Sequence, residues 1–264
     1  MDLSAIDPSS TPGFTGGKKA GAAELQANAA EFAELQEKLF AESRFGGTRS
    51  VLLVLQAMDT AGKGGIVDHV LGLANPQGIQ AFSFKAPTDE EKAHDFLWRI
   101  RKRLPEPGHI GVFDRSHYED VLIHRVRGFS TPEVIEERYG LINSFESEVV
   151  ASGTTIVKVM LHISPEEQKA RLAARLDDPT KQWKYNPGDV DERLLWPAYM
   201  QAYEIAIDRT STPAAPWHVV PANHKWYARL AVQRLLLDAL RSLDLQWPAP
   251  DYDVEAEKRR LAAS

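Results

Sequence analysis

The spacing of hydrophobic and polar positions changes near residue 50. Before this point, segment 23–40 places its large apolar residues at helical intervals, as Leu25, Phe32, Leu35 and Leu39. This spacing predicts an amphipathic arm that packs on the main domain or on a second subunit. After it, short apolar runs alternate with helical stretches, which is typical of a parallel sheet covered by helices on both faces. The chain is therefore predicted to have an α/β fold.

The apolar runs predict five strands and the periodic segments predict six helices between and after them. The strands are expected at 51–55, 81–84, 110–113, 155–163 and 218–220. The helices are expected at 64–73, 89–104, 132–151, 165–176, 191–209 and 226–243. No internal repeat and no second sheet are found, so one doubly wound domain over residues 23–248 is predicted.

Two terminal segments are expected to lie outside this domain. Residues 1–22 are rich in Ser, Pro, Gly and Lys, a composition that cannot bury much apolar surface, so a flexible tail is predicted. Residues 249–264 are strongly charged and predict a short peripheral helix.

Composition narrows the possible chemistry. The 264 residues are 43% hydrophobic, enough to bury the core of one domain. The absence of cysteine excludes disulfides, thiolate metal sites and cysteine nucleophiles, and the histidines lack the spacing of a zinc site. A net charge of −6 argues against a nucleic-acid partner. No run is long enough to span a membrane or to serve as a signal peptide, so a cytoplasmic protein without a membrane partner is predicted.

The segment VLLVLQAMDTAGKGGIV joins a buried strand, a loop of small residues and the start of a helix. Glycine lets successive backbone N–H groups point at one anion, and Lys63 adds a positive charge, so a phosphate-binding loop is predicted. The loop departs from G-x-x-x-x-G-K-[ST] at Ala57 and at Gly64, where a hydroxyl would hold magnesium. Asp59 is the expected substitute ligand. The alternative is an ordinary glycine-rich turn with Lys63 facing solvent.

A second apolar strand, in HIGVFDRSHYED, ends in Asp114 and Arg115. Ligands of open α/β sheets collect at the carboxyl ends of the strands, so Asp114 is expected beside the phosphate loop as a metal ligand. Taken alone, an aspartate at this position is more often a helix cap than a metal ligand. Its position after a strand that follows a phosphate loop favours the metal ligand.

Transfer of phosphate between two polyanions requires cations and alignment, because repulsion is the main obstacle. Lys85 follows the second strand, while Arg115 and Arg125 flank Asp114. Arg171 and Arg175 lie four residues apart on one helical face, and Lys181 and Lys184 follow a break that contains a proline. This arrangement indicates a hinged lid over about 165–190. The alternative for this segment is a solvated helix whose own aspartates neutralise its arginines.

These blocks resemble the polyphosphate kinase 2 family. The resemblance extends from about residue 25 to 243, through LQAMDTAGKGGIVDHV, FKAPTDEE, FDRSHYEDVLIHRV, INSFE, HISPEEQKARL, KQWKY and APWHVVPANHKWYARL. It implies a P-loop kinase-like, three-layer α/β/α sandwich with a five-stranded parallel sheet and an α-helical lid, similar to thymidylate kinase. It also accounts for the unusual loop, because Asp59 and Gly64 stand where the family itself has Asp and lacks the hydroxyl.

The resemblance implies roles for individual residues. Asp59 and Asp114 would organise Mg²⁺ and, with Lys63 and Arg115, form the catalytic set. The phosphates would be held by the loop and by cations around it, namely Ala61, Gly62, Lys63, Gly64, Gly65, Lys85, Arg115, Arg171 and Arg175. Asp120 and Arg125 would face the nucleotide.

The resemblance also implies the reaction, which is reversible, magnesium-dependent transfer of the terminal phosphoryl group of polyphosphate to ADP, and in one subgroup also to AMP. Homodimers or homotetramers are expected. An ATP-dependent nucleotide or small-molecule kinase of the same fold is the main alternative. A regulatory nucleotide-binding protein is a second alternative, but it would need a base-specific motif such as N-K-x-D, which this sequence lacks. A third is a polyphosphate-binding module without catalysis, in which Asp59 and Asp114 would be dispensable.

Overall fold

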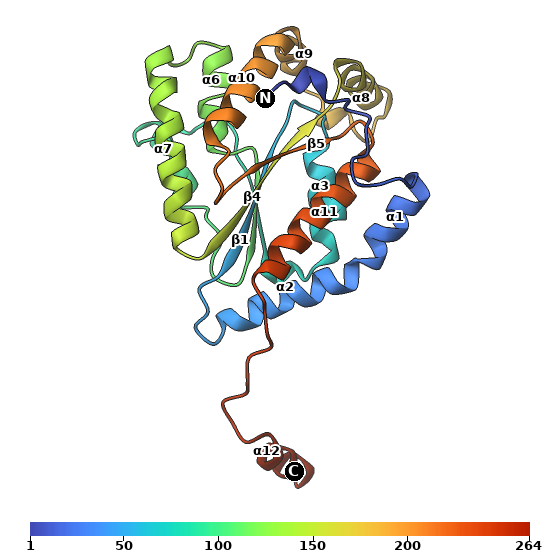
Figure 1. The fold of residues 1–264 in the computed structure, drawn as a ribbon, viewed down its shortest axis with the longest axis vertical. Helices are drawn as coiled ribbons and strands as arrows, with labels where there is room; N and C mark the ends of the chain where they lie inside the picture. The colour runs from blue at the N-terminus through green and yellow to red at the C-terminus, as the bar shows by residue number, and fades with distance from the viewer.

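A five-stranded, fully parallel sheet forms the centre of the computed structural model, which describes residues 1–264 (Figure 1). Its strands are β1 Ser50–Gln56, β2 Ile79–Ser83, β3 Ile110–Asp114, β4 Thr154–His162 and β5 Trp217–Pro221. They lie in the order β2-β3-β1-β4-β5. β1 is central, because Val51 pairs with Ile110 on one side and Thr155 on the other. All five predicted strands are confirmed.

Helices cover both faces of the sheet. One face carries α7 Pro132–Ala151 and α10 Trp196–Thr210, and the other carries α2 Ala29–Ser43, α3 Lys63–His69 and α11 Lys225–Ser242. Alternate residues of β1 enter the two cores, Leu52 under α7 and Leu53 under α11. A strand buried on both faces must be apolar throughout, which explains the unbroken run in the sequence. The three-layer α/β/α sandwich is thus confirmed.

Three of the predicted helices are interrupted in the structure. Segment 64–73 forms α3, which ends at His69, and the separate turn η2 Leu71–Leu73. Segment 89–104 forms only α4 Asp89–Lys92 and α5 Trp98–Arg101, because the Asp95 carboxylate accepts the N–H of Leu97 and ends the helical ladder. Segment 191–209 divides into α9 Gly188–Leu194 and α10, where Pro197 lies in the first turn and cannot donate to a preceding helix.

The remaining elements are short connections and the helix of the predicted lid. They are η2 Leu71–Leu73, η3 Pro76–Gly78, η4 His117–Asp120, α6 Ile123–Val126, α8 Pro165–Asp177 and η5 Gln182–Lys184. α8 begins where the Ser164 side chain accepts the N–H of Glu167, a helix-capping interaction that serine favours.

The N-terminal residues differ from the predicted flexible tail. Leu3, in η1 Leu3–Ala5, is buried in the core under α7 and α10, and the Met1 ammonium pairs with Asp208 at 2.6 Å. The carbonyl of Pro8 accepts the N–H of Asn223 at 3.0 Å. A composition poor in apolar residues does not prevent ordering here, because the few that are present insert into the core of the domain.

The predicted arm forms two helices, α1 Lys18–Ala27 and α2, separated at Asn28. α1 packs against α11 of the same chain, where the Gln233 side chain donates to the Leu25 carbonyl at 2.9 Å. At the other end, α12 Val254–Ala262 projects away from the sandwich on an extended segment and buries none of its residues (Figure 1). None of the helices is both long enough and apolar enough to cross a bilayer.

Candidate active site

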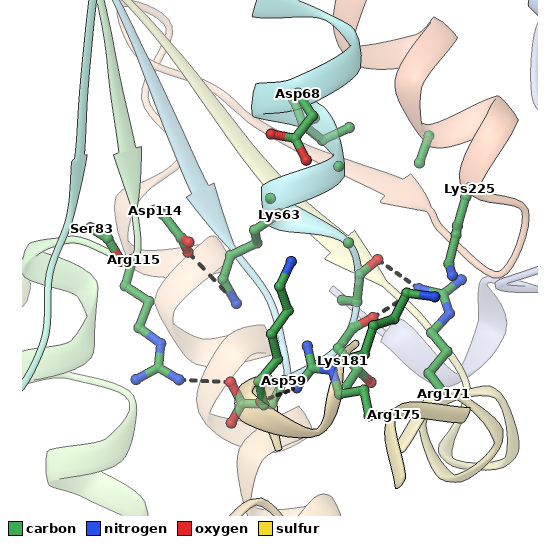
Figure 2. Close-up of a pocket in the computed structure, with 18 of the residues that line it drawn as sticks. Asp59, Lys63, Asp68, Ser83, Asp114, Arg115, Arg171, Arg175, Lys181 and Lys225 are labelled. Atoms are coloured by element: carbon green, nitrogen blue, oxygen red, sulfur yellow. Dashed lines mark hydrogen bonds and ion pairs between the residues drawn. The ribbon is translucent and has the colours of Figure 1, made fainter. Parts of the chain in front are cut away.

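A cavity of about 780 Å³ lies at the carboxyl ends of β1, β2 and β3, between the loop before α3 and the helices α8 and α11. Figure 2 shows its walls, with Asp59 and Lys63 from the loop, Asp114 and Arg115 from the end of β3, and Arg171 and Lys225 from the facing helices. The sheet thus brings the two motifs found in the sequence into one site.

The loop between β1 and α3 is shaped by residues with positive φ. Gly62 has φ +120°, which favours glycine, and Thr60 has φ +66°. Gly62 caps α3, so the N–H groups of its first turn, from Lys63 to Gly65, lack intrahelical partners and border the cavity. A Cβ at Gly64 would meet no protein atom within 4 Å, which leaves that side of the loop open to a ligand. Ala61, Gly62, Gly64 and Gly65 all line the cavity as predicted.

Lys63 is buried at the floor of the cavity, with 9% of its surface exposed. Its Nζ donates to the Ala57 carbonyl at 3.3 Å and lies 3.9 Å from Oδ1 of Asp114 (Figure 2). The alternative of a solvent-facing lysine on an ordinary turn is therefore wrong. A lysine held this way presents a fixed positive charge to any anion in the loop.

Asp59 and Arg115 form an ion pair across the cavity, with the Arg115 guanidinium donating to Oδ1 of Asp59 at 2.7 Å. Burial opposes ionisation of Asp59, but the positive charges of Lys63 and Arg115 outweigh it and hold the pKa of this carboxyl below its usual value. Burial likewise opposes the charge of Arg115, yet Glu119 and Asp59 raise its pKa. Both groups are thus ionised at neutral pH.

The carboxylates of the cavity suit a magnesium ion for which water molecules and substrate phosphates supply most of the ligands. Asp59 and Asp114 both line the cavity, and no cluster of three or more acidic or histidine side chains that could hold a metal exists in the structure. Mg²⁺ typically binds one or two carboxylates together with substrate phosphates and waters rather than an all-protein cage. Two carboxylates beside a phosphate loop fit that preference.

Arg171 of α8 has a different set of partners from the one predicted. Its Nε donates to Glu167, and its two terminal nitrogens donate to four backbone carbonyls, those of Thr60, Ala61, Ala222 and Asn223. These five bonds use all five donors of a guanidinium. Arg171 therefore stabilises the phosphate loop and contributes positive charge to the cavity, but it has no N–H donor left for a phosphate.

Arg175, one turn further along α8, lies between the loop and the rest of the predicted lid. It donates to the Lys184 carbonyl at 3.0 Å and lies 3.6 Å from Asp189. The predicted lid cations Lys181 and Lys184 also line the cavity, as does Lys85 from the end of β2. The alternative of a fully solvated helix does not apply to Arg171 and Arg175, which face the site.

The cavity wall is strongly cationic although the chain is acidic. Its cations are Lys63, Lys85, Arg115, Arg171, Arg175, Lys181, Lys184, Lys225 and Arg229, against the acids Asp59, Asp68, Asp114 and Glu167. Lys225 and Arg229 were missed in the sequence, although their positions four residues apart in the helix after β5 could have indicated them. The excess of cations makes this a site for a polyanion.

A second cavity, of about 220 Å³, shares Asp59 and Arg115 with the first. Its walls combine apolar and aromatic side chains with acidic ones, namely Met58, Leu122, Ile123, Tyr199 and Tyr203 with Glu119, Asp189 and Glu192. Burial raises the pKa of the Glu119 carboxyl, and burial together with repulsion from Asp59 raises that of Asp189. Such walls suit an uncharged planar ring with polar edges rather than a phosphate.

Two residues expected at the nucleotide lie outside both cavities. Asp120 is buried, with its carboxylate 3.5 Å from Nε2 of His124 and 3.9 Å from the guanidinium of Arg99. Arg125, on α6, lines neither cavity. Apart from Asp59 and Arg115, the residues of the second cavity were not identified from the sequence, because they come from the loop, η4, α6, α9 and α10 and share no motif.

Comparison with known proteins identifies close relatives of this chain. The family model for polyphosphate kinase 2 matches residues 16–247. An AMP/ADP-polyphosphate phosphotransferase from Meiothermus ruber is 44% identical over 251 residues, which cover 95% of this chain and 92% of that protein. An ADP-polyphosphate phosphotransferase from Rhodopseudomonas palustris is 42% identical over 85% of this chain and 80% of its own. The crystal structure of polyphosphate kinase 2 from Arthrobacter aurescens, 62% identical, covers 100% of this chain and 93% of its own with a TM-score of 0.98.

Proposed function

Because the chain belongs to the polyphosphate kinase 2 family, we propose that it transfers the terminal phosphoryl group of inorganic polyphosphate to ADP, forming ATP, and to AMP, forming ADP. The observation that carries this proposal is the cationic cavity around the phosphate loop, whose nine Lys and Arg side chains suit a long polyanion. An ATP-dependent kinase with a small neutral acceptor would need fewer cations than these nine.

The residues around the loop perform the transfer by alignment and charge. The acceptor phosphate is already ionised at neutral pH, so no side chain has to remove a proton from it. Lys63 and the N–H groups of the first turn of α3 stabilise the negative charge on the transferred group, while Arg115 orients the acceptor phosphate from the opposite wall. No covalent enzyme intermediate is required.

Mg²⁺ is the proposed cofactor, held by Asp59 and Asp114. When bound, it would neutralise and align the phosphate oxygens of the two substrates. Each carboxylate also lies beside a cation of the site, Asp59 beside Arg115 and Asp114 beside Lys63.

The two cavities suggest how the acceptor lies. We place the phosphates of the nucleotide in the larger cavity, at the Asp59–Arg115 pair, and its base and ribose in the smaller one. The remaining chain of the donor would extend past Arg175 toward Lys181, Lys184, Lys225 and Arg229. Helix α8 and the residues up to about 190 would act as the lid that covers both.

The proposal extends to location and assembly. We place the reaction in the cytoplasm, where nucleotides are available, and expect a homodimer or homotetramer. The exposed apolar side chains Phe129, Val134 and Leu141 on and before α7 provide surface for such contacts.

The direct test is nucleotide analysis after incubation of the purified protein with Mg²⁺, long-chain polyphosphate and either ADP or AMP. We expect ATP from ADP, and both ADP and ATP from AMP. A parallel reaction with ATP and AMP but without polyphosphate separates the donors. No product from polyphosphate, together with transfer from ATP, would replace the proposal with the ATP-dependent kinase.

The nucleoside cavity can be tested separately. Ile123 lies on its wall and is only partly buried at the edge of the core, so Ile123→Trp is expected to fill the cavity while the fold is kept. We expect the KM for ADP to rise about tenfold or more, while the KM for polyphosphate stays near that of the wild type. Ile123→Val is the matched control and should change neither. An unchanged KM for ADP in the Trp variant would place the nucleoside elsewhere.

A further inference from the structure

Arg115 has an unfavourable backbone conformation, since its φ of +63° is rare for any residue other than glycine. Such a residue persists only where the surrounding structure imposes the conformation, and that often occurs at functional sites. Part of the restraint is local, because the N–H of Arg115 donates to the Leu55 carbonyl at 3.0 Å. The residues after Arg115 must supply the rest.

Those residues, Ser116 to Tyr118, are completely enclosed. Ser116 is 0% exposed, His117 1% and Tyr118 0%. The Ser116 hydroxyl accepts the N–H of Tyr118 at 3.2 Å and lies at the same distance from the side-chain amide of Gln56 in β1. The segment that follows Arg115 is thus inserted into the core rather than lying on the surface.

Tyr118 ends in a cluster of buried charges under α7. Lys158, from the middle of β4, is 0% exposed, and its Nζ lies 2.5 Å from Oε2 of Glu146 and 2.9 Å from the Tyr118 hydroxyl. The other Glu146 oxygen accepts from that hydroxyl at 2.8 Å and lies 3.2 Å from Nε2 of His117. Lys158 also donates to the Thr210 carbonyl of α10 at 2.8 Å. One ion pair therefore ties β4, α7 and α10 to two consecutive residues of the segment after Arg115.

Stability alone does not explain a charged pair at this position. A buried ion pair contributes little compared with well-packed apolar residues of similar size, because both charges lose their hydration. The pair does fix the orientation of the side chains bonded to it, because a carboxylate whose oxygens are held in place accepts hydrogen bonds only from donors at defined positions. An apolar pair would hold Tyr118 less specifically.

We propose that Lys158 and Glu146 are positioning residues for phosphoryl transfer. Through Tyr118 and His117 they fix the segment after β3, so that Arg115 keeps its strained backbone and points at Asp59 while Asp114 faces Lys63. The inference rests on the proposed function of this site. Lys158 and Glu146 themselves touch neither cavity.

The test compares three variants with the wild type. The double variant Lys158→Met/Glu146→Leu removes both charges and keeps their bulk, and Tyr118→Phe removes only the hydroxyl. Thr154→Val is the control, because Thr154 is buried at the first position of the same strand β4, away from the cluster, with its hydroxyl 2.9 Å from that of Ser50. Each is assayed with polyphosphate and ADP, its thermal unfolding is recorded, and its ADP binding is measured by calorimetry.

We expect kcat of the double variant to fall roughly tenfold to a hundredfold, with ADP affinity reduced and the KM for polyphosphate nearly unchanged. Its unfolding temperature should stay near that of the wild type. Tyr118→Phe should show a smaller loss in the same direction, and the control none. Folded variants with wild-type kcat and ADP affinity would overturn the proposal. If the double variant does not fold, the result for Tyr118→Phe decides alone. A wild-type protein that binds ADP but transfers no phosphate would refute the proposed function. The ADP affinities of the variants would still test whether Lys158 and Glu146 position Arg115.

Discussion

The Lys63→Ala variant is expected to lose about a hundredfold to a thousandfold in kcat, because a preorganised charge at a transferred group contributes at that scale. Lys63 Nζ has only the Ala57 carbonyl and the Asp114 carboxylate near it, so its charge is available to a phosphate in the loop. The fold should survive, since Lys63 lies on the wall of the cavity and its amine has only the Ala57 carbonyl and the Asp114 carboxylate as partners. Steady-state kinetics with polyphosphate and ADP, together with thermal unfolding, measure both effects.

Lys181→Ala provides the comparison for this prediction. Lys181 lines the same cavity but is 59% exposed and paired with Asp178, so its charge is screened by solvent. We expect a moderate rise in the KM for polyphosphate and little change in kcat. Equal losses in the two variants would mean that the cavity acts only through its total charge and that Lys63 has no special place in it.

Asp114→Asn is expected to lower kcat by a similar factor of about a hundred or more, with a shift in metal dependence. Asparagine keeps the shape of the side chain but removes the negative charge, and a neutral amide is a weaker ligand for Mg²⁺. The Mg²⁺ concentration needed for half-maximal rate should therefore rise. The measurement is kcat as a function of Mg²⁺ concentration for both proteins.

Asp95→Asn is the matched control, because it makes the same chemical change outside the cavity, where the side chain accepts the N–H of Leu97. It should behave as the wild type at every Mg²⁺ concentration. An Asp114→Asn protein with unaltered turnover and unaltered metal dependence would remove Asp114 from the site and favour the helix-cap explanation of this residue.

Much of the fold and half of the site were predictable because their determinants are local. An unbroken apolar run such as 51–55 predicts a strand that is buried on both faces of the sheet. Glycine followed by lysine directly after such a strand indicates a loop that binds phosphate. The rule that parallel strands end at one edge then placed Asp114 and Lys85 beside the loop without knowledge of any contact.

The predictions for residues 1–22 and for Arg171 were wrong for the same reason, because contacts between residues distant in the chain decided both. The composition of residues 1–22 predicts a flexible tail, but Leu3 is buried in a core to which α7 and α10, more than a hundred residues away in the chain, contribute. The charge of Arg171 predicts a phosphate ligand, but its five donors face carbonyls of the phosphate loop and of the residues after β5. Neither position carries a signal in its neighbours along the chain.

By itself, the sequence determined the class of fold, the phosphate loop, the acidic residues beside it and the family, because each depends on residue types at short, regular spacings. Only the tertiary structure decided which cations share a cavity, that a second cavity opens at Asp59 and Arg115, and that a buried ion pair lies behind Arg115. The physical reason is that hydrogen-bond partners and cavity walls are chosen by how helices and strands pack across the sheet, and packing brings together residues whose separation in sequence has no period.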